Sequence, residues 1–283
     1  MQFSVIIPTY NRALFLDELL ECLVNQRYKN FEVLVCDDGS TDNTKEIVNK
    51  YIKVLNLKYF LGTNWGGPAR PRNIGIQNAQ GEWLCFVDSD DLWHAEKLEA
   101  VSKVTHQPVD VICHLFHIKG SEKCIGRYRK TPFYSRVEDF VYNGNRIVNS
   151  SLCIRKRTVE QVGGFSENPS FIGVEDYELL IKLALIKARF YCLNRVLGHY
   201  RISDTNISGD FMVQIRKIEL LLLSYGKLIL LNKIKIYALL DYMKGNYFSE
   251  SGSEKKQARK YYRNTLLKGS TVIQAKALVR LLK

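Results

Sequence analysis

Residues 31–53 read FEVLVCDDGSTDNTKEIVNKYIK and combine an apolar run, an acidic turn and a helical segment. Residues 31–36 have the length and the mostly apolar character of a buried strand. Thr41 or Asp42 can cap a helix that runs to about Lys53. A strand followed directly by a helix is the repeating unit of a parallel sheet. This stretch therefore predicts an α/β fold.

The same alternation continues on both sides of this stretch. Further strands are predicted over residues 3–7 (FSVII), 56–62 (NLKYFLG) and 82–87 (EWLCFV), with a short helix over residues 70–80. Leu16, Leu19, Leu20 and Leu23 recur at helical spacing after the first strand. We expect a mixed, mostly parallel sheet with helices on both faces. Ligands bind such sheets beyond the carboxyl ends of the strands, which points to three polar clusters, PTYNR, DDGS and DSDD.

The pattern is less regular beyond residue 109. It predicts strands over residues 109–118, 151–155 and 190–201, and a strong helix over residues 173–188. Residues 119–136 are polar, and we expect a loop there. The segment between His117 and Arg136 carries five basic side chains, and we expect it to help to shape a ligand site. Beyond residue 208 the pattern is helical only.

Charge and cysteine usage limit the class of protein. Lys and Arg exceed Asp and Glu by 41 to 29, and residues 207–283 contribute +10 of the net +12. Seven cysteines without a Cys-x-x-Cys pair suggest neither a disulfide framework nor a zinc site. The first residues lack the features of an export signal, and residues 218–231 are too short and too charged to span a bilayer. We expect a reduced, cytoplasmic protein.

Acidic and basic clusters at the predicted strand ends suggest chemistry. Asp88, Ser89, Asp90 and Asp91 bring several carboxylates to one strand end, which suits Mg²⁺ or Mn²⁺. The alternative is that these acids cap a helix that begins near Leu92. Arg70 and Arg72 open a helix and favour a diphosphate, unless both lie on a solvated face. Asp37 and Asp38 form a second acidic pair that suits a ribose or a uracil, again with capping as the alternative.

Five ordered segments resemble family 2 glycosyltransferases: residues 4–12 (SVIIPTYNR), 31–44 (FEVLVCDDGSTDNT), 69–75 (ARPRNIG), 81–91 (GEWLCFVDSDD) and 173–180 (GVEDYELL). The resemblance covers about the first 205 residues. It implies the GT-A fold, a Rossmann-like sheet with helices on both faces, here followed by a C-terminal helical extension. It also implies a nucleotide-sugar-binding half over residues 1–108, an acceptor-binding half over residues 109–206 and a basic helical region over residues 207–283.

The resemblance further implies an inverting, metal-dependent hexosyltransferase and assigns roles to residues. Asp176 would be the catalytic base. Mn²⁺ or Mg²⁺ would be held by Asp88, Asp90 and, by position on its strand, His199. The nucleotide sugar, with UDP as the default nucleotide, would be bound by Pro8, Thr9, Tyr10, Asp38, Arg72, Asp88 and Ser89.

The acceptor expected from the resemblance is a glycan or a lipid-linked glycan, such as a polyprenyl diphosphate or lipid A carrier, in polysaccharide or lipopolysaccharide synthesis. The chain lacks the Gln-x-x-Arg-Trp motif of processive relatives, which favours single or short additions. Residues 207–283 either dock on anionic lipid at the inner face of the cytoplasmic membrane or are simply solvated. The oligomeric state is left open.

Two other functions are compatible with part of the sequence. A sugar nucleotidyltransferase would carry a Gly-rich loop with an Arg after the first strand, where this chain has PTYNR. A nucleic-acid-binding protein could use the basic tail, but no recognition motif is visible and the polar clusters lie in the nearly neutral part of the chain. No nucleic acid partner is expected.

Overall fold

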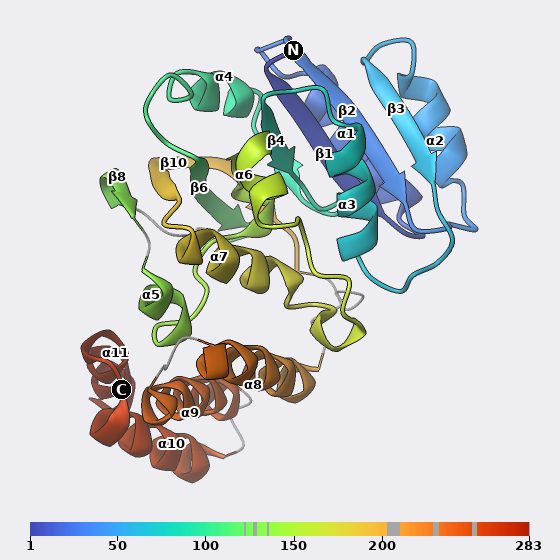
Figure 1. The fold of residues 1–283 in the computed structure, drawn as a ribbon. Helices are drawn as coiled ribbons and strands as arrows, with labels where there is room; N and C mark the ends of the chain where they lie inside the picture. Colours follow the sequence, from blue (N-terminus) through green and yellow to red (C-terminus); the bar gives the residue numbers. More distant parts are fainter. Residues whose placement is uncertain are drawn as a thin grey trace. The chain divides into compact units, whose positions relative to one another are not determined.

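The computed structural model describes residues 1–121, 123–126, 129–134, 136–202, 210–228, 232–250 and 254–282 (Figure 1). These residues contain ten strands: β1 (Phe3–Thr9), β2 (Phe31–Asp37), β3 (Leu57–Leu61), β4 (Trp83–Phe86), β5 (Leu92–Trp93), β6 (Val111–Ile118), β7 (Cys124–Ile125), β8 (Arg129–Tyr134), β9 (Cys153–Arg155) and β10 (Arg189–Tyr200).

The described residues also form eleven α-helices and two short 3₁₀ turns. The helices are α1 (Ala13–Val24), α2 (Thr44–Tyr51), α3 (Ala69–Asn78), α4 (Lys97–Ser102), α5 (Val137–Val141), α6 (Lys156–Gln161), α7 (Glu175–Leu185), α8 (Phe211–Leu228), α9 (Lys233–Glu250), α10 (Lys255–Lys268) and α11 (Thr271–Leu282). The turns are η1 (Asn149–Ser151) and η2 (Pro169–Phe171).

All ten strands join one mixed sheet in the order β3-β2-β1-β4-β9-β6-β10-β5, with β7 beside β6 and β8 beside β10. Strands β3, β2, β1 and β4 are parallel, and β10 is parallel to β6. Strand β9 runs antiparallel between β4 and β6. The carboxyl ends of β1, β2 and β4 therefore lie at one edge of the sheet, where the polar clusters begin.

Helices pack on both faces of the parallel part of this sheet. Alternate β1 residues (Phe3, Val5, Ile7) share one buried core with the leucines of α1. On the opposite face, Ile6 faces α3, and a Cβ atom added to Gly75 of α3 would lie 2.5 Å from Ile6 Cγ2. A larger residue would push α3 off the sheet, so Gly75 sets how closely this helix approaches the strands.

The sequence predicted most of these elements. The strands and helices expected over the first 90 residues are confirmed, as are the strands near residues 109–118, 151–155 and 190–201, the helix after residue 173 and the all-helical C-terminal part. The loop expected over residues 119–136 is wrong in part, because β7 and β8 add to the sheet there. The helix proposed to begin near Leu92 is also wrong: Leu92 and Trp93 form β5, and α4 begins only at Lys97.

His114 on β6 makes part of the folding stability depend on pH. Its ring is fully buried and stacks on Phe116, with 5.0 Å between ring centres. Burial holds the pKa of His114 well below its usual value of 6.5, with Lys97 adding to the effect. Below about pH 6.5 the unfolded chain therefore binds a proton that the folded chain does not, so stability falls as the pH falls.

We expect His114→Phe to remove this dependence. Between pH 7.5 and pH 5.5 the wild type should lose about 1.4 kcal/mol more unfolding free energy than the variant. Urea unfolding of both proteins at the two pH values measures the difference. Equal losses in the two proteins would show that the pKa of His114 is the same in the folded and the unfolded chain, which would contradict this account.

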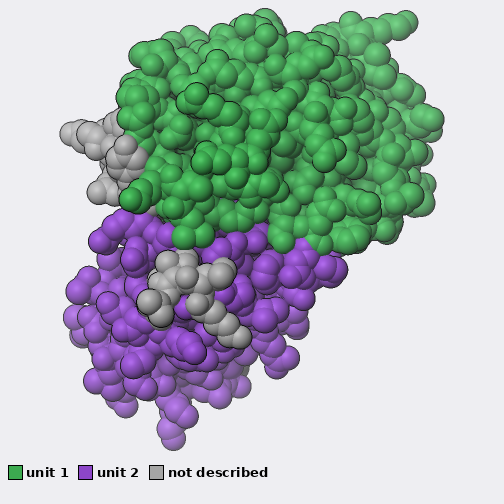
Figure 2. Space-filling view, viewed as in Figure 1, with its two compact units in different colours: residues 1–135, 146–167, 182–204 green, residues 136–145, 168–181, 205–283 purple. Residues whose placement is uncertain are grey.

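The chain forms two compact units, which Figure 2 shows in green and purple. The first, residues 1–135, 146–167 and 182–204, contains the sheet. The second, residues 136–145, 168–181 and 205–283, contains α5, the beginning of α7 and the helices α8 to α11. These units reflect packing, whereas the predicted division at residues 108 and 206 concerns binding roles and stays a prediction.

Hydrogen bonds join the three segments of the second unit. Gln214 on α8 donates from Nε2 to the carbonyl of Gly173 (2.6 Å), and Tyr225 on α8 donates from its hydroxyl to Glu178 on α7 (3.0 Å). The backbone N–H of Asn232 donates to the Tyr142 hydroxyl (2.8 Å). The C-terminal helices are thus bound to the segment from which α7 begins.

Within the described ranges, no helix has both the length and the apolar character that crossing a bilayer requires.

Candidate functional site

The loops that follow β1 and β2 are joined into one structure. The backbone N–H of Asn11 donates to Ser40 Oγ, and the N–H of Thr41 donates back to Asn11 Oδ1, both at 2.8 Å. Asp42 Oδ2 accepts from the N–H of Ala13 (3.0 Å) at the start of α1. Asn11 adopts φ 50°, which Asn tolerates better than most residues. The predicted clusters PTYNR and DDGS therefore form one surface.

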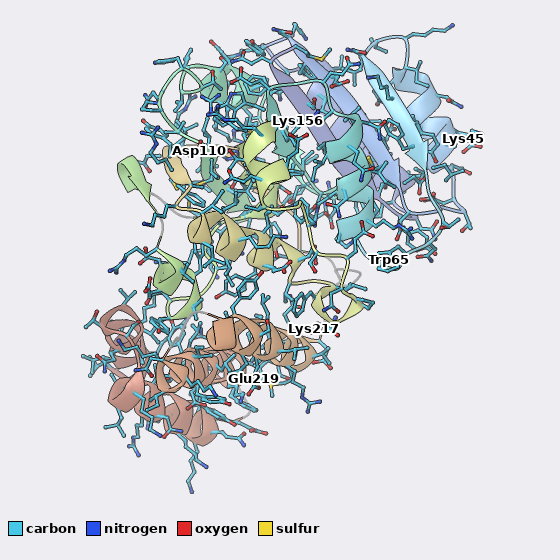
Figure 3. All side chains as sticks on the ribbon, viewed as in Figure 1. Lys45, Trp65, Asp110, Lys156, Lys217 and Glu219 are labelled. Atoms are coloured by element: carbon cyan, nitrogen blue, oxygen red, sulfur yellow. The ribbon has the colours of Figure 1, made fainter. Side chains whose placement is uncertain are left out.

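Asp37 and Asp38 lie at the end of β2 and have different tasks. Asp37 accepts from the N–H of Ser40 (2.7 Å) and from the Tyr59 hydroxyl (2.6 Å). Burial raises the pKa of the Tyr59 hydroxyl, and the hydrogen bond to Asp37 raises it further. The Asp38 carboxylate accepts from the N–H groups of Trp65 (2.9 Å) and Gly66 (3.0 Å) on the loop between β3 and α3, where Figure 3 labels Trp65. Asp38 thus fixes this loop against the end of β2.

A cavity of about 520 Å³ opens beside these two carboxylates. Its lining also includes Gly62, Thr63 and Arg70. Arg70 stacks over the Trp65 ring at 5.1 Å, and its side chain stays about half exposed. A buried acceptor, loop backbone and an exposed guanidinium group around a cavity of this size suit a nucleoside.

The backbone around this cavity leaves no room for a side chain at position 39. Gly39 has φ +88°, and an added Cβ atom would lie 2.9 Å from the backbone nitrogen of Asn64. Gly39 therefore permits both the turn after β2 and the close approach of the β3–α3 loop.

Four polar residues end β4, and each of the three acids has a different partner. Asp88 Oδ1 accepts from Arg72 Nη2 (2.6 Å), and Asp90 accepts from the Arg12 guanidinium group. Asp91 is fully buried and accepts from the backbone N–H of Arg201 (3.1 Å) and from the Ser150 hydroxyl. Ser89 is buried as well. Of the two predicted arginines, Arg72 meets the acids of β4, while Arg70 lines the cavity.

Two of the acids that follow β4, Asp90 and Asp91, have raised pKa values. Burial raises the pKa of Asp90, the charge of Asp88 raises it further, and Arg12 offsets part of the effect. Burial and Asp88 raise the pKa of Asp91 in the same way. A cation beside Asp88 and Asp90 would relieve this repulsion. None of these acids caps a helix at Leu92, because β5 begins there.

These residues fit Mg²⁺ or Mn²⁺ as an ion shared with a substrate. Within the described residues, no group of three or more His, Cys, Asp or Glu side chains is arranged as a complete metal cage. Mg²⁺ usually binds through one or two carboxylates together with substrate phosphates, so it does not need such a cage. Asp88 and Asp90 are a neighbouring pair of carboxylates of this kind.

His199 contacts other histidines. Its Nε2 lies 3.0 Å from His94 Nε2, and its ring centre lies 6.2 Å from that of His117. Burial and the two neighbouring histidines lower the pKa of His199, so the ring is neutral near pH 7. A neutral imidazole is the form that binds metals, but the contacts of this ring described by the structure are with histidines, not with Asp88 or Asp90.

Two residues that the sequence analysis did not identify hold the acid cluster in place. Asn149 and Ser150 of η1 lie about 60 positions along the chain from β4. Asn149 Nδ2 donates to Asp88 Oδ1 (3.2 Å), while the Ser150 hydroxyl accepts from the N–H of Asp88 (3.1 Å) and donates to Asp91. Antiparallel pairing of β9 with β4 brings η1 to the acids. No local motif reveals a pairing of this kind.

We expect Ser150→Ala to weaken both the fold and the activity. It leaves the N–H of Asp88 and one oxygen of Asp91 without this partner, at a cost of about 1–3 kcal/mol per buried group. Thermal unfolding and release of nucleoside diphosphate measure the two effects. Ser151→Ala is the matched control, because the Ser151 hydroxyl donates to the nearby carbonyl of Val148 (2.6 Å) and not to the acids that follow β4. Equal effects of the two substitutions would contradict a role for Ser150 in the cluster.

Asp176 lies in the second unit, in the first turn of α7, beside two other acids. Glu175 is buried and accepts from the N–H of Gly173 (2.6 Å). Glu178 is buried and accepts from the Tyr225 hydroxyl. Asp176 is only half buried and so is the acid of this turn that solvent and ligands reach. The remaining predicted residues, Pro8, Thr9 and Tyr10, end β1, with Thr9 buried and Tyr10 exposed.

Comparison with known proteins identifies relatives of this arrangement. The model of the family described as "Glycosyl transferase family 2" matches residues 4–163. Poly(ribitol-phosphate) beta-N-acetylglucosaminyltransferase TarS of Staphylococcus aureus is 47% identical over 124 residues, which are 42% of this chain and 21% of TarS. The matched segment is therefore about a fifth of that relative. The amylovoran biosynthesis glycosyltransferase AmsB of Erwinia amylovora is 28% identical over 71% of this chain and 70% of its own length.

Solved structures extend the match to nearly the whole chain. S. aureus TarS 1-349 in complex with UDP-GlcNAc has a TM-score of 0.66 and 26% identity over 97% of this chain and 83% of that one. The mannosyltransferase PcManGT of Pyrobaculum calidifontis, solved with GDP-Man and Mn²⁺, has a TM-score of 0.62 and 20% identity over 99% of this chain and 79% of that one, which supports the fold alone. The predicted GT-A fold is confirmed.

Proposed function

Because the chain belongs to glycosyl transferase family 2, we propose that it moves a sugar from a UDP-linked donor to a hydroxyl group of a cell-surface glycan, with inversion at the anomeric carbon. Membership makes the chain a glycosyltransferase that uses a nucleotide sugar. The observation that carries the finer proposal is that the cavity beside Asp38 and the acids of β4 lie along one edge of the sheet. The two other functions weighed from the sequence are not activities of this family.

UDP is the proposed nucleotide. TarS, which is similar over nearly the whole chain, has been solved with UDP and with UDP-GlcNAc. In the proposal Pro8, Thr9 and Tyr10 line the nucleoside site and Asp38 contacts the base or the ribose. Arg72 reaches the base or the diphosphate through the site it shares with Asp88, with Ser89 beside it. Arg70, which lines the cavity, joins this set.

Asp88 and Asp90 are the proposed holders of Mn²⁺ or Mg²⁺. His199 as a third ligand stays a prediction, because no three of the described His, Cys, Asp and Glu side chains are grouped to hold a metal ion. A divalent ion bound there would act as a Lewis acid that offsets negative charge on the departing diphosphate. Arg12 and Arg72 already pair with the same carboxylates, and Arg12 offsets part of the rise in the pKa of Asp90. PcManGT, which shares the fold, contains Mn²⁺.

Asp176 is the proposed general base. The acceptor hydroxyl must lose its proton as it attacks the anomeric carbon, and the half-exposed carboxylate of Asp176 can receive it. Attack from the face opposite the diphosphate in a single displacement inverts that carbon and needs no covalent enzyme intermediate.

The proposed acceptor is a surface polysaccharide, lipopolysaccharide or lipid-linked glycan. By their names, TarS acts on poly(ribitol phosphate) and AmsB takes part in amylovoran biosynthesis. Such acceptors are anionic or membrane-bound. We therefore place the enzyme in the cytoplasm, peripheral to the inner face of the membrane, where the basic C-terminal helices favour anionic lipid.

A panel of nucleotide sugars tests the function. Each is added with and without Mn²⁺, thermal unfolding is recorded, and those that stabilise the protein are assayed for release of the nucleoside diphosphate. We expect UDP-sugars to stabilise the protein and to be turned over in the presence of a glycan acceptor. If only a GDP-sugar or a dTDP-sugar stabilises the protein, the donor is not a UDP-sugar. If no nucleotide sugar is turned over, the proposed function is contradicted.

A further inference from the structure

Helix α10 presents one face of cationic side chains to solvent. Successive residues of a helix are about 100° apart, so five exposed cations fall within an arc of about 140°: Lys255, Lys256, Arg259, Lys260 and Arg263. The opposite face packs on α9, where the Tyr262 hydroxyl donates to Asn246 Oδ1 (3.0 Å) and Thr265 donates to the carbonyl of Ala238 (3.2 Å). The packing of α10 therefore directs its cationic face outward.

This cationic face has few acids near it along the chain. Residues 254–282 hold eight Lys and Arg side chains and a single acid, Glu254, for a net charge of +7. None of the five cations of the face makes an ion pair with a residue that the structure describes. Long side chains extend from the four C-terminal helices in Figure 3. The face is open to an anionic partner.

Helix α11 presents an apolar stripe to solvent. Ile273 and Ala277 are buried on its inner side. On the outer side an arc of about 120° carries five exposed apolar residues: Val272, Ala275, Leu278, Val279 and Leu282. The only other residue in this arc is Thr271, at the first position of the helix. Leu278 is 49% exposed and Leu282 79%, and Leu267 at the end of α10 is 80% exposed. Exposed apolar residues aligned in this way mark an interaction surface.

An anionic lipid surface matches both features. The α10 face supplies cations for lipid phosphates, and the α11 stripe supplies side chains that insert at the boundary of the acyl chains. A second copy of this chain would cover the α11 stripe, but it would bring two strongly cationic surfaces together. A polyanion such as RNA would bind the α10 face and leave the α11 stripe without a role.

We propose that the outer faces of α10 and α11 form a docking surface for anionic phospholipid, which holds the protein on the membrane without crossing it. The inference rests on the proposed function only in assuming that the acceptor is at the membrane. Binding to vesicles needs neither donor nor acceptor, so its failure would leave the transferase assays unchanged, and failure of those assays would leave vesicle binding unchanged.

Vesicle flotation of the full chain tests the surface, with neutral phosphatidylcholine vesicles and vesicles that contain phosphatidylglycerol. We expect binding to the anionic vesicles only. Lys256→Glu with Arg259→Glu should lower the apparent affinity about tenfold or more. The matched control is Lys45→Glu with Lys53→Glu, which makes the same charge change at exposed positions on and just after α2 and should change affinity less than about twofold.

A second pair of variants separates lipid from other partners. Leu278→Ser with Leu282→Ser keeps the charge and should still lower the affinity for anionic vesicles about tenfold, since two leucines no longer insert. Ile52→Ser with Val54→Ser, also at exposed positions, is its control. The proposal is overturned if anionic vesicles are not bound. It is also overturned if the α11 variant binds vesicles as the wild type does, which indicates a site for a polyanion. A wild type that is a dimer, and that this variant separates into monomers, would overturn it as well.

Discussion

Asp176→Asn should abolish sugar transfer while the protein still binds its nucleotide. The substitution keeps the size of the side chain and removes its ability to accept a proton, which is a loss of about 10² to 10⁴-fold for a general base. Turnover in the presence of acceptor measures the first effect. Calorimetric titration with UDP measures the second and should give an unchanged affinity.

Glu178→Gln is the matched control, since it makes the same chemical change in the same turn of α7. Glu178 accepts from the Tyr225 hydroxyl, so the control should lower the unfolding temperature and leave most of the turnover. A variant at position 176 that retains a substantial part of the wild-type rate would remove Asp176 from the mechanism.

Asp90→Asn should remove the dependence of nucleotide binding on a divalent ion. The Asp90 carboxylate is close enough to Asp88 for the charge of Asp88 to raise its pKa. Replacing it by a neutral amide leaves one fewer anionic ligand for the ion. Titrations with UDP in the presence and absence of Mn²⁺ should then give the same affinity, and turnover should fall by about 10²-fold or more.

Asp91→Asn is the control for this second substitution. Asp91 follows Asp90 directly but is bonded to Ser150 and to the N–H of Arg201, so its replacement should change stability and keep the response to Mn²⁺. An Mn²⁺-dependent affinity that survives in Asp90→Asn would count against the proposed metal site.

The sequence predicted the part of the fold that local patterns encode. Residues 3–87 alternate between strand and helix periodicity, and the parallel order of β1 to β4 follows from that alternation. The errors fall where pairing decides. Strand β5 is only two residues long, Leu92 and Trp93, and it forms because these residues pair with β10. Strand β8 forms for the same reason.

The candidate site shows the same limit. The three acidic and polar clusters could be found from their positions after predicted strands. Arg70 and Arg72 are two positions apart on one helix, so they point about 200° apart, and only packing decides that Arg70 lines the cavity while Arg72 is buried against Asp88. Asn149 and Ser150 depend on a strand pairing that no local pattern encodes.

The second compact unit is assembled from three separate stretches of chain, and α7 begins inside it. A protein shortened after residue 206 would therefore lose Gln214 and Tyr225, which hydrogen-bond to Gly173 and Glu178. Shortened versions would confound an effect on catalysis with misfolding of the segment that carries Asp176. In evolution the same arrangement couples the two ends of this unit, so that a change in the C-terminal helices has to remain compatible with the start of α7.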